Sequence, residues 1–274
     1  MIKELSSSFK KAKKLQASFL EKGKIFFSIV QWELKKKSKK KQKNIVKGEF
    51  LGFSFLSYNY WTIDYLFDEI FLNNEYYFKT QNKTPLIMDC GSNIGMSILY
   101  FKHLYPNSRI IGFEPNPNSF KLLKKNVEEN NLKNVEINNL GLYNEESEIS
   151  FYIDSNLSTL IGSINKDRGG NKELKVSAKK LSSYLKDVEE VDLVKIDVEG
   201  AEINIIMELL ESNTLNKVKE YIIEYHHNMG EDRSNLSSFL AIFETNGYDY
   251  NIKTSFKNIS SFQDILIHFY KKAF

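Results

Sequence analysis

A chain of 274 residues with 42% hydrophobic and 14% aromatic residues can form one large α/β domain with an extension, or at most two domains. Its single cysteine, Cys90, excludes an internal disulfide framework. The net charge of +3 conceals an asymmetry, because residues 1–47 carry fifteen Lys and three Glu, a net of +12, which leaves −9 for residues 48–274. Such an acidic body argues against a general nucleic-acid-binding core, since that affinity depends on neutralising phosphates.

Residues 1–47 form a basic arm with an amphipathic helical pattern. Apolar residues recur at positions 2, 5, 9, 12, 15 and 19 among lysines, and a second apolar patch covers 25–30. This patch is too short to span a membrane and lacks a signal-peptide cleavage pattern, so we expect a cytoplasmic protein. Through residues 1–43 the arm could lie on the anionic inner face of the membrane. We favour the alternative, in which the arm packs on the body or in a homodimer.

Residues 48–84 are rich in aromatic side chains and contain a helical pattern over 64–72. We therefore expect an aromatic-rich helical cap that precedes the main domain of residues 85–274. Most of these rings should pack in a core, although those of Tyr58–Trp61 could stack on a sugar ring or on adenine.

From residue 85 onward, strand and helix patterns alternate, which implies a doubly wound, mostly parallel sheet in an α/β fold. No helix separates the last two strands, so we expect the final one to be an antiparallel edge strand. The expected strands are 85–90, 109–114, 134–140, 148–153, 174–178, 191–197, 218–225, 248–254 and 263–270, and the expected helices are 95–105, 117–130, 180–186, 200–211 and 233–246.

The turn Asp89–Gly95 joins the first of these strands to the first helix. A strand, a glycine-bearing turn and a helix are the layout of a nucleotide-binding unit, and Glu114 follows at about the distance of a ribose-binding carboxylate. Only Gly91 and Gly95 are present, and the carboxylate of Asp89 would repel a pyrophosphate. S-adenosylmethionine, which has an ammonium, a sulfonium and a ribose diol, suits the turn better than NAD. The expected cofactor-binding residues are Asp89, Gly91, Ser92, Asn93, Gly95, Glu114, Pro115, Asn116, Gly141 and Asp197.

Methyl transfer from a sulfonium usually requires removal of a proton from the acceptor. Asp197 ends a hydrophobic strand, where an idle charge would be costly. His226 is the preferred base, because it lies two residues beyond Glu224 on the same side of a strand and that carboxylate could orient it. Glu199 and Glu202 are either catalytic or helix-start carboxylates that complement the helix dipole.

The sequence does not decide whether the site holds a metal ion or whether the loop 155–171 binds substrate. Asp197, Glu224 and His226 could hold a divalent ion, but nothing in their spacing demands one and we favour a metal-free site. The polar loop 155–171 suits a substrate-binding flap, or a plain surface connection.

The same segments resemble the FkbM-type S-adenosylmethionine-dependent methyltransferases over roughly residues 85–250. The resemblance rests on Met88–Gly95, Ile111–Pro117, Leu123–Asn126, Asn130–Leu132, Val194–Glu202 and Ile222–His226. It implies a Rossmann-like methyltransferase fold and a hydroxyl acceptor, often a sugar or a polyketide-like metabolite.

The basic arm leads us to expect O-methylation of a sugar, glycan or lipid-linked saccharide. The alternative is a non-catalytic module of the same fold whose arm holds a partner or nucleic acid. A nucleic-acid methyltransferase ranks third, because the fourth core strand lacks the Asn/Asp-Pro-Pro-aromatic motif that follows it in base amino-methylating enzymes.

Overall fold

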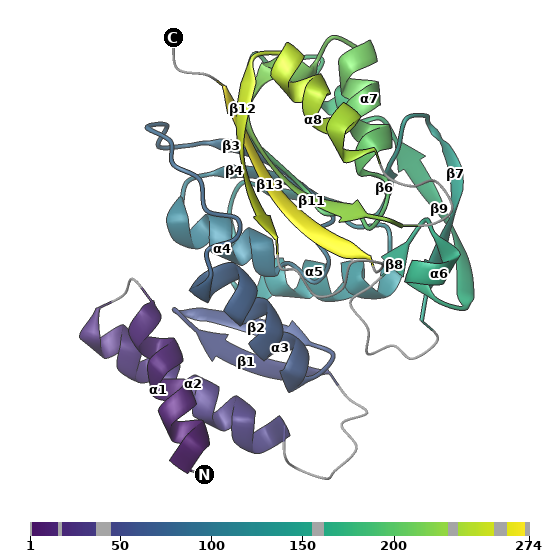
Figure 1. The fold of residues 1–274 in the computed structure, drawn as a ribbon. Helices are drawn as coiled ribbons and strands as arrows, with labels where there is room; N and C mark the ends of the chain where they lie inside the picture. Colours follow the sequence, from purple (N-terminus) through teal and green to yellow (C-terminus); the bar gives the residue numbers. More distant parts are fainter. Residues whose placement is uncertain are drawn as a thin grey trace.

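The computed structural model describes residues 2–15, 18–36, 45–154, 162–229, 235–254 and 262–271 (Figure 1). At its centre lies a seven-stranded sheet in the order β12-β13-β11-β10-β3-β4-β5. The bounds of its strands are β3 Leu86–Cys90, β4 Arg109–Phe113, β5 Val135–Asn138, β10 Val191–Ile196, β11 Val218–His227, β12 Tyr248–Thr254 and β13 Gln263–Lys271.

The doubly wound, Rossmann-like sheet predicted from the sequence is confirmed. Strands β5, β4, β3, β10 and β11 run parallel, and β13 is antiparallel to both β11 and β12. One detail is wrong: β13 does not form the edge, because β12 lies outside it. The burial pattern explains this order, since Ile265, Ile267 and Phe269 of β13 are buried, whereas the end of β12, residues 251–254, is exposed.

Helices cover both faces of this sheet, namely α4 (Met96–Leu104), α5 (Pro117–Glu129), α7 (Glu202–Glu211) and α8 (Leu236–Thr245) (Figure 1). Neighbouring residues of one strand point to opposite faces, so each strand contributes to two cores. Ile87 packs in the core that includes α4 and α5, whereas the next residue, Met88, packs in the core that includes α7 and α8. The strands are therefore apolar on both sides, and polar side chains collect at their ends.

Four further strands form a second sheet in the order β6-β9-β7-β8. They are β6 Gly141–Leu142, β7 Ser147–Ile153, β8 Gly162–Ser163 and β9 Lys172–Lys179, joined by the short helix α6 (Lys166–Gly169). The helix expected over 180–186 is only a 3₁₀ turn, η2 (Leu181–Tyr184), and a second such turn, η3 (Leu215–Lys217), precedes β11. Part of the expected flap, residues 155–161, lies outside the described residues.

The arm consists of two helices, α1 (Ile2–Lys14) and α2 (Phe19–Lys36), and packs against the cap (Figure 1). The ring of Trp32 is 2% exposed and meets Phe50 and Phe67 edge-on, with centroid distances of 6.1 and 5.4 Å. Ion pairs from Lys11 and Lys36 to Asp64 hold the same contact. The arm thus packs on the cap through buried aromatic rings and ion pairs. No helix within the described segments is long and apolar enough to cross a membrane.

The cap contains one element that the sequence analysis did not predict, a hairpin of β1 (Val46–Phe50) and β2 (Phe53–Ser57). Helix α3 (Tyr60–Leu66) follows and continues into a π-helical turn, η1 (Phe67–Leu72). Two amides, from Asn126 of α5 and from its C-cap residue Asn130, bind β2 in the manner of a further strand. Asn126 accepts from the backbone N–H of Leu56 and donates to its carbonyl, and Asn130 does the same at Ser54. The amide of Asn126 also donates to the carbonyl of Ile94 in the glycine-bearing turn.

Candidate functional site

The glycine-bearing turn after β3 is fastened to the end of β4 by main-chain hydrogen bonds. The N–H groups of Gly91 and Ser92 donate to the carbonyl of Phe113 at 3.0 and 2.9 Å. Oε2 of Glu114 accepts from the N–H of Asn93 at 2.9 Å, and its Oε1 accepts from the N–H of Asn116 at 2.8 Å. Burial raises the pKa of Glu114 to about 7. A carboxylate has about four acceptor positions, so two remain for a ligand.

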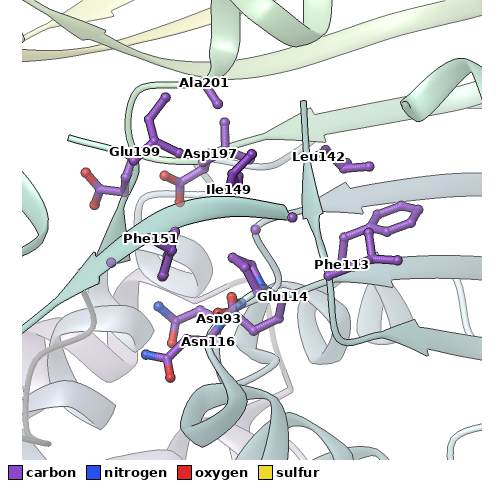
Figure 2. Close-up of a pocket in the computed structure, with 17 residues that line it drawn as sticks. Asn93, Phe113, Glu114, Asn116, Leu142, Ile149, Phe151, Asp197, Glu199 and Ala201 are labelled. Carbon is purple, nitrogen blue, oxygen red and sulfur yellow. Dashed lines mark hydrogen bonds between the residues drawn. The ribbon is translucent and has the colours of Figure 1, made fainter. Parts of the chain in front are cut away.

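A narrow, largely apolar slot opens beside Glu114, between the central sheet and the second sheet. Figure 2 shows Asn93, Glu114 and Asn116 close together on one side of it and Asp197 with Glu199 on the other. The apolar residues that line it include Phe113, Leu140, Leu142, Ile149 and Phe151. Among the described residues no Lys or Arg lines the slot, so it suits a nucleoside that carries no phosphate.

A second cavity, of about 540 Å³, adjoins the slot and shares Gly91, Asn93, Asp197 and Glu199 with it. Its walls combine aromatic rings from the cap with several carboxylates. The aromatic residues are Trp61, Tyr65 and Tyr76, and the acidic ones are Glu69, Asp197, Glu199, Glu224 and Asp264. Trp61 is 66% exposed, and burial raises the pKa of Glu69 to about 7. An exposed ring above acceptor groups is an arrangement that can bind a polyhydroxylated ligand.

A buried ammonium connects the glycine-bearing turn to the wall between the two cavities. Nζ of Lys195 lies 3.5 Å from carboxylate oxygens of both Asp89 and Asp197 and donates to the carbonyl of Gly91. Asp89 is fully buried, accepts from the hydroxyl of Ser97 at 2.6 Å and lines neither cavity. The structure therefore places Asp89 behind the turn, where it holds Lys195, rather than in direct contact with a ligand.

The glycines in this turn are required by neighbouring protein atoms. Gly91 has a φ of +83°, and a Cβ atom there would lie 1.8 Å from the carbonyl oxygen of Asp197. Gly95 has a φ of +94° and begins α4, where a Cβ would press on Leu123. Both positions need glycine because the turn is left-handed and closely packed. The backbone conformation and the neighbouring protein atoms are therefore enough to exclude a side chain at both positions.

The remaining predicted cofactor residues lie around Glu114. Ser92 is buried, and its hydroxyl donates to the carbonyl of Asp89 at 2.9 Å. Asn116 caps α5 through the N–H of Asn118, and Pro115 and Gly141 line the slot with it. The turn, the end of β4 and β6 thus meet at one place.

His226 is completely buried near the end of β11, and its two nitrogens have different surroundings. Nδ1 lies 2.7 Å from Oε1 of Glu202, the first residue of α7. Nε2 lies 3.1 Å from Glu199, 4.0 Å from Asp197 and 3.9 Å from Asp264, without hydrogen-bond geometry to any described residue. The carboxylate that orients His226 is therefore Glu202 and not, as expected, Glu224.

Burial and the neighbouring carboxylates shift the pKa of His226 in opposite directions. Burial lowers the pKa of His226, but the nearby carboxylates of Glu202 and Glu199 outweigh it and hold the pKa well above its usual range. Burial and the nearby Asp197 raise the pKa of Glu224 well above that of an ordinary glutamate. The ring of His226 lines neither cavity, whereas Asp197 lines both.

The turn that carries Glu199 is held by a residue of the predicted flap. Glu199 has a φ of +54°, a left-handed conformation that is unfavourable for a residue other than glycine. Arg168 of α6 binds both of its carboxylate oxygens, at 2.7 and 3.2 Å. Arg168, Glu69 and Asp264 were not predicted as site residues, because none of them lies in the motifs that end the core strands. Arg168 and Glu199 both line the second cavity.

The chain matches the Methyltransferase FkbM domain over residues 89–250. It is 31% identical to Methyltransferase 1 of Beauveria bassiana (strain ARSEF 2860) over 164 residues, which cover 53% of this chain and 66% of that protein. It is 30% identical to Methyltransferase sdnD of Sordaria araneosa over 173 residues, which cover 52% of this chain and 67% of that protein. The match thus spans about two thirds of the length of each relative.

A solved structure has the same fold. The crystal structure of Methyltransferase FkbM from Methylobacillus flagellatus KT aligns with a TM-score of 0.51 and 12% identity, covering 96% of this chain and 58% of that one.

The site residues fit S-adenosylmethionine. Glu114 offers two acceptor positions for a ribose diol, the apolar slot can take a base, and Asp197 stands beside the turn where the cationic end would lie. The family match contains the turn, Glu114, Asp197 and Glu224 and covers more than half of the chain. This protein therefore belongs to the FkbM methyltransferase family, and S-adenosylmethionine is its cofactor.

Proposed function

We propose that this protein is an O-methyltransferase that acts on a hydroxyl group of a sugar, a glycan or a lipid-linked saccharide. The observation that supports this most directly is the composition of the larger cavity, in which carboxylates and an exposed indole ring adjoin the cofactor slot. Carboxylates accept hydrogen bonds from hydroxyl groups, and an indole face packs on the apolar face of a pyranose ring.

We assign the cofactor to the slot and the acceptor to the larger cavity. In the slot, Glu114 accepts from the ribose hydroxyls while Phe113, Leu142 and Phe151 contact the base. In the larger cavity, Trp61 and Tyr65 from α3 provide a surface for the acceptor. When bound, S-adenosylmethionine supplies an electrophilic methyl group, and the shared wall of Asn93 and Asp197 is where the acceptor oxygen must meet it.

Removal of the acceptor proton falls to carboxylates that face the larger cavity. His226, the base expected from the sequence, is buried behind them with Nδ1 bound to Glu202. Asp197 and Glu224 both line the cavity, and Asp197 also accepts a long hydrogen bond of 3.4 Å from the hydroxyl of Tyr76. We assign Asp197 to orienting the acceptor hydroxyl and Glu224 to taking its proton.

We further propose that the arm can bring the protein to an anionic membrane surface. Although Lys11 and Lys36 are engaged with Asp64, several large apolar side chains of the arm remain exposed. These are Phe9, Phe19, Leu20, Phe27 and Leu34, with exposed fractions between 61% and 91%. Exposed apolar residues on a lysine-rich helix favour binding to vesicles of anionic lipid. Co-sedimentation at low salt with anionic and with neutral vesicles tests this, and equal behaviour toward the two would contradict it.

The test of the enzymatic function is a transfer assay with S-adenosylmethionine labelled on its methyl group. Free sugars, glycans and lipid-linked saccharides are offered alongside amine acceptors, and the methylated atom is identified by mass spectrometry and NMR. We expect label on a saccharide oxygen, and Glu114→Gln, which weakens cofactor binding, should reduce the label when the cofactor is subsaturating. Label on nitrogen would refute O-methylation. A chain that binds the cofactor and labels no acceptor class would favour the alternative of a non-catalytic module.

A further inference from the structure

Behind the wall of the larger cavity lies a buried histidine, one nitrogen of which has no hydrogen-bond partner among the described residues. The side chain of His226 is 0% exposed, and its Nε2 has no hydrogen-bond partner among the described residues. A buried ring nitrogen without a hydrogen-bond partner is costly, because it has lost its hydrogen bonds to water. This nitrogen points at carboxylates of three separate segments, since Glu199, Asp264 and Asp197 lie 3.1, 3.9 and 4.0 Å from it.

The opposite nitrogen of the ring is arranged as in a metal-binding histidine. Nδ1 lies 2.7 Å from Oε1 of Glu202, and that oxygen also accepts from the N–H of Gly200 at 3.0 Å. Glu202 is itself 3% exposed, so its position is fixed. A carboxylate bound to one ring nitrogen fixes the tautomer and aims the other nitrogen at an ion.

The carboxylates around His226 outnumber the Lys and Arg side chains that pair with them. Five carboxylates surround the ring: Asp197, Glu199, Glu202, Glu224 and Asp264. Within the described part of the chain, Arg168 pairs with Glu199, and Lys195 is shared between Asp197 and Asp89. Glu224 and Asp264 have no Lys or Arg ion-pair partner there.

We propose that Asp197, Glu199 and His226 bind a divalent cation, with Glu224 and Asp264 beside it. The ligand atoms of the first three residues all lie within 4.8 Å of one another, and the same holds for Glu224, His226 and Asp264. Neighbouring ligands of an octahedral ion with bonds of about 2.1 Å are about 3 Å apart, which the His226–Glu199 distance of 3.1 Å already matches. Several carboxylates with one imidazole suit Mn²⁺ better than Mg²⁺, because Mg²⁺ takes oxygen ligands.

The role of this ion rests on the proposed methyl transfer, whereas its binding does not. Because Asp197 and Glu199 line the larger cavity, the ion faces the acceptor. It polarises the acceptor hydroxyl, whose proton passes to Glu224. The oxygen then forms a bond to the methyl carbon as the bond from that carbon to sulfur breaks, which leaves neutral S-adenosylhomocysteine.

The experiment measures binding of Mn²⁺ to the full-length chain after treatment with EDTA. Free Mn²⁺ is followed by electron paramagnetic resonance, and we expect one submillimolar site per chain. His226→Gln and Glu199→Gln should each weaken binding by roughly tenfold or more. The matched control is His268→Gln, since His268 also pairs with a glutamate, Glu220, at 2.7 Å but lies on β13 away from the cluster. Its affinity should equal that of the unchanged chain.

A second measurement keeps the test decisive if a variant fails to fold. Bound Mn²⁺ in the unchanged chain should show electron spin echo modulation from a directly coordinated imidazole nitrogen. Absence of a submillimolar site, absence of nitrogen coupling, or unchanged affinity in a folded His226→Gln variant would overturn the proposal. Binding of S-adenosylhomocysteine is measured in the same samples. A chain that binds Mn²⁺ and S-adenosylhomocysteine but methylates no hydroxyl group would refute the proposed function and would leave the metal site unchallenged.

Discussion

The ammonium of Lys195 donates a hydrogen bond of 2.7 Å to the carbonyl oxygen of Gly91. This bond joins the middle of the sheet to the turn that shapes the cofactor site, because Lys195 lies in β10 and Gly91 directly follows β3. The pKa of Lys195 is raised: burial opposes the charge, but the carboxylates of Asp197 and Asp89 outweigh burial. One buried cation therefore fixes both the turn and the residue that we assign to the acceptor.

Removal of that cation should destabilise the fold. Lys195→Met leaves the carboxylates of Asp89 and Asp197 without their partner, and breaking a buried pair costs about 3–5 kcal/mol of unfolding free energy. Denaturation by urea measures the loss. Lys175→Met is the control, because its pair with Glu173 is exposed and is worth about 1 kcal/mol or less. Equal losses in the two variants would contradict the assignment, and Asp89→Asn should restore part of the stability lost in Lys195→Met.

Glu114 should determine affinity for the cofactor. Glu114→Gln replaces two acceptor oxygens by one and puts an amide donor where ribose hydroxyls donate, so affinity for S-adenosylhomocysteine should fall at least about tenfold. Calorimetric titration measures this. Glu136→Gln on β5 is exposed and should bind normally. Unchanged affinity in Glu114→Gln would remove Glu114 from the cofactor site.

The same carboxyl should make stability depend on pH. Its pKa of about 7 in the folded chain exceeds the usual 4.5, so the stability linked to its proton is complete below pH 4.5 and is lost as pH rises through 7. The difference of about 2.5 pKa units corresponds to about 3 kcal/mol. Urea denaturation from pH 4.5 to 8 should show Glu114→Gln gaining stability over the unchanged chain toward high pH. Parallel curves for the two proteins would disprove this.

Trp61 should contribute to binding of the acceptor and not to binding of the cofactor. Trp61→Ala removes an exposed ring from the larger cavity, and the lost stacking should raise KM for the acceptor roughly tenfold at unchanged affinity for S-adenosylhomocysteine. Tyr77→Ala, an exposed ring in a different cavity, serves as control. If the two variants have the same KM, the acceptor does not stack on Trp61.

The arm should stabilise the cap. Trp32→Ala empties a fully packed position against Phe50 and Phe67 and should cost about 3–5 kcal/mol of unfolding free energy. Leu34→Ala, in the same helix but 61% exposed, should change stability by about 0.5 kcal/mol or less. Thermal and urea unfolding of both variants measure the difference. A minor effect of Trp32→Ala would mean that the arm contributes little to the folded body.

Much of the central sheet could be predicted because each strand is a short apolar run that can be recognised from neighbouring residues alone. Glu114 and Asp197 each follow an apolar strand, and parallel strands bring such residues to one edge. The β1–β2 hairpin escaped prediction because its two-residue turn is Leu51-Gly52, with Leu51 at a φ of +48°, instead of the usual Asn-Gly. The partner of His226 was also missed, since His226 lies in β11 and Glu202 reaches it from the first residue of α7. Register between strands and contacts between distant loops are not encoded in short patterns.

The amides of Asn126 and Asn130 also have a consequence for how copies of this protein behave toward one another. By pairing with the backbone of Leu56 and Ser54, they occupy N–H and C=O groups that an open strand edge would otherwise offer to another chain. The cap hairpin is thereby protected from intermolecular strand addition by two side chains. Conversion of Asn130 to aspartate by deamidation would remove its donor, expose the carbonyl of Ser54 and open the hairpin as a starting point for aggregation.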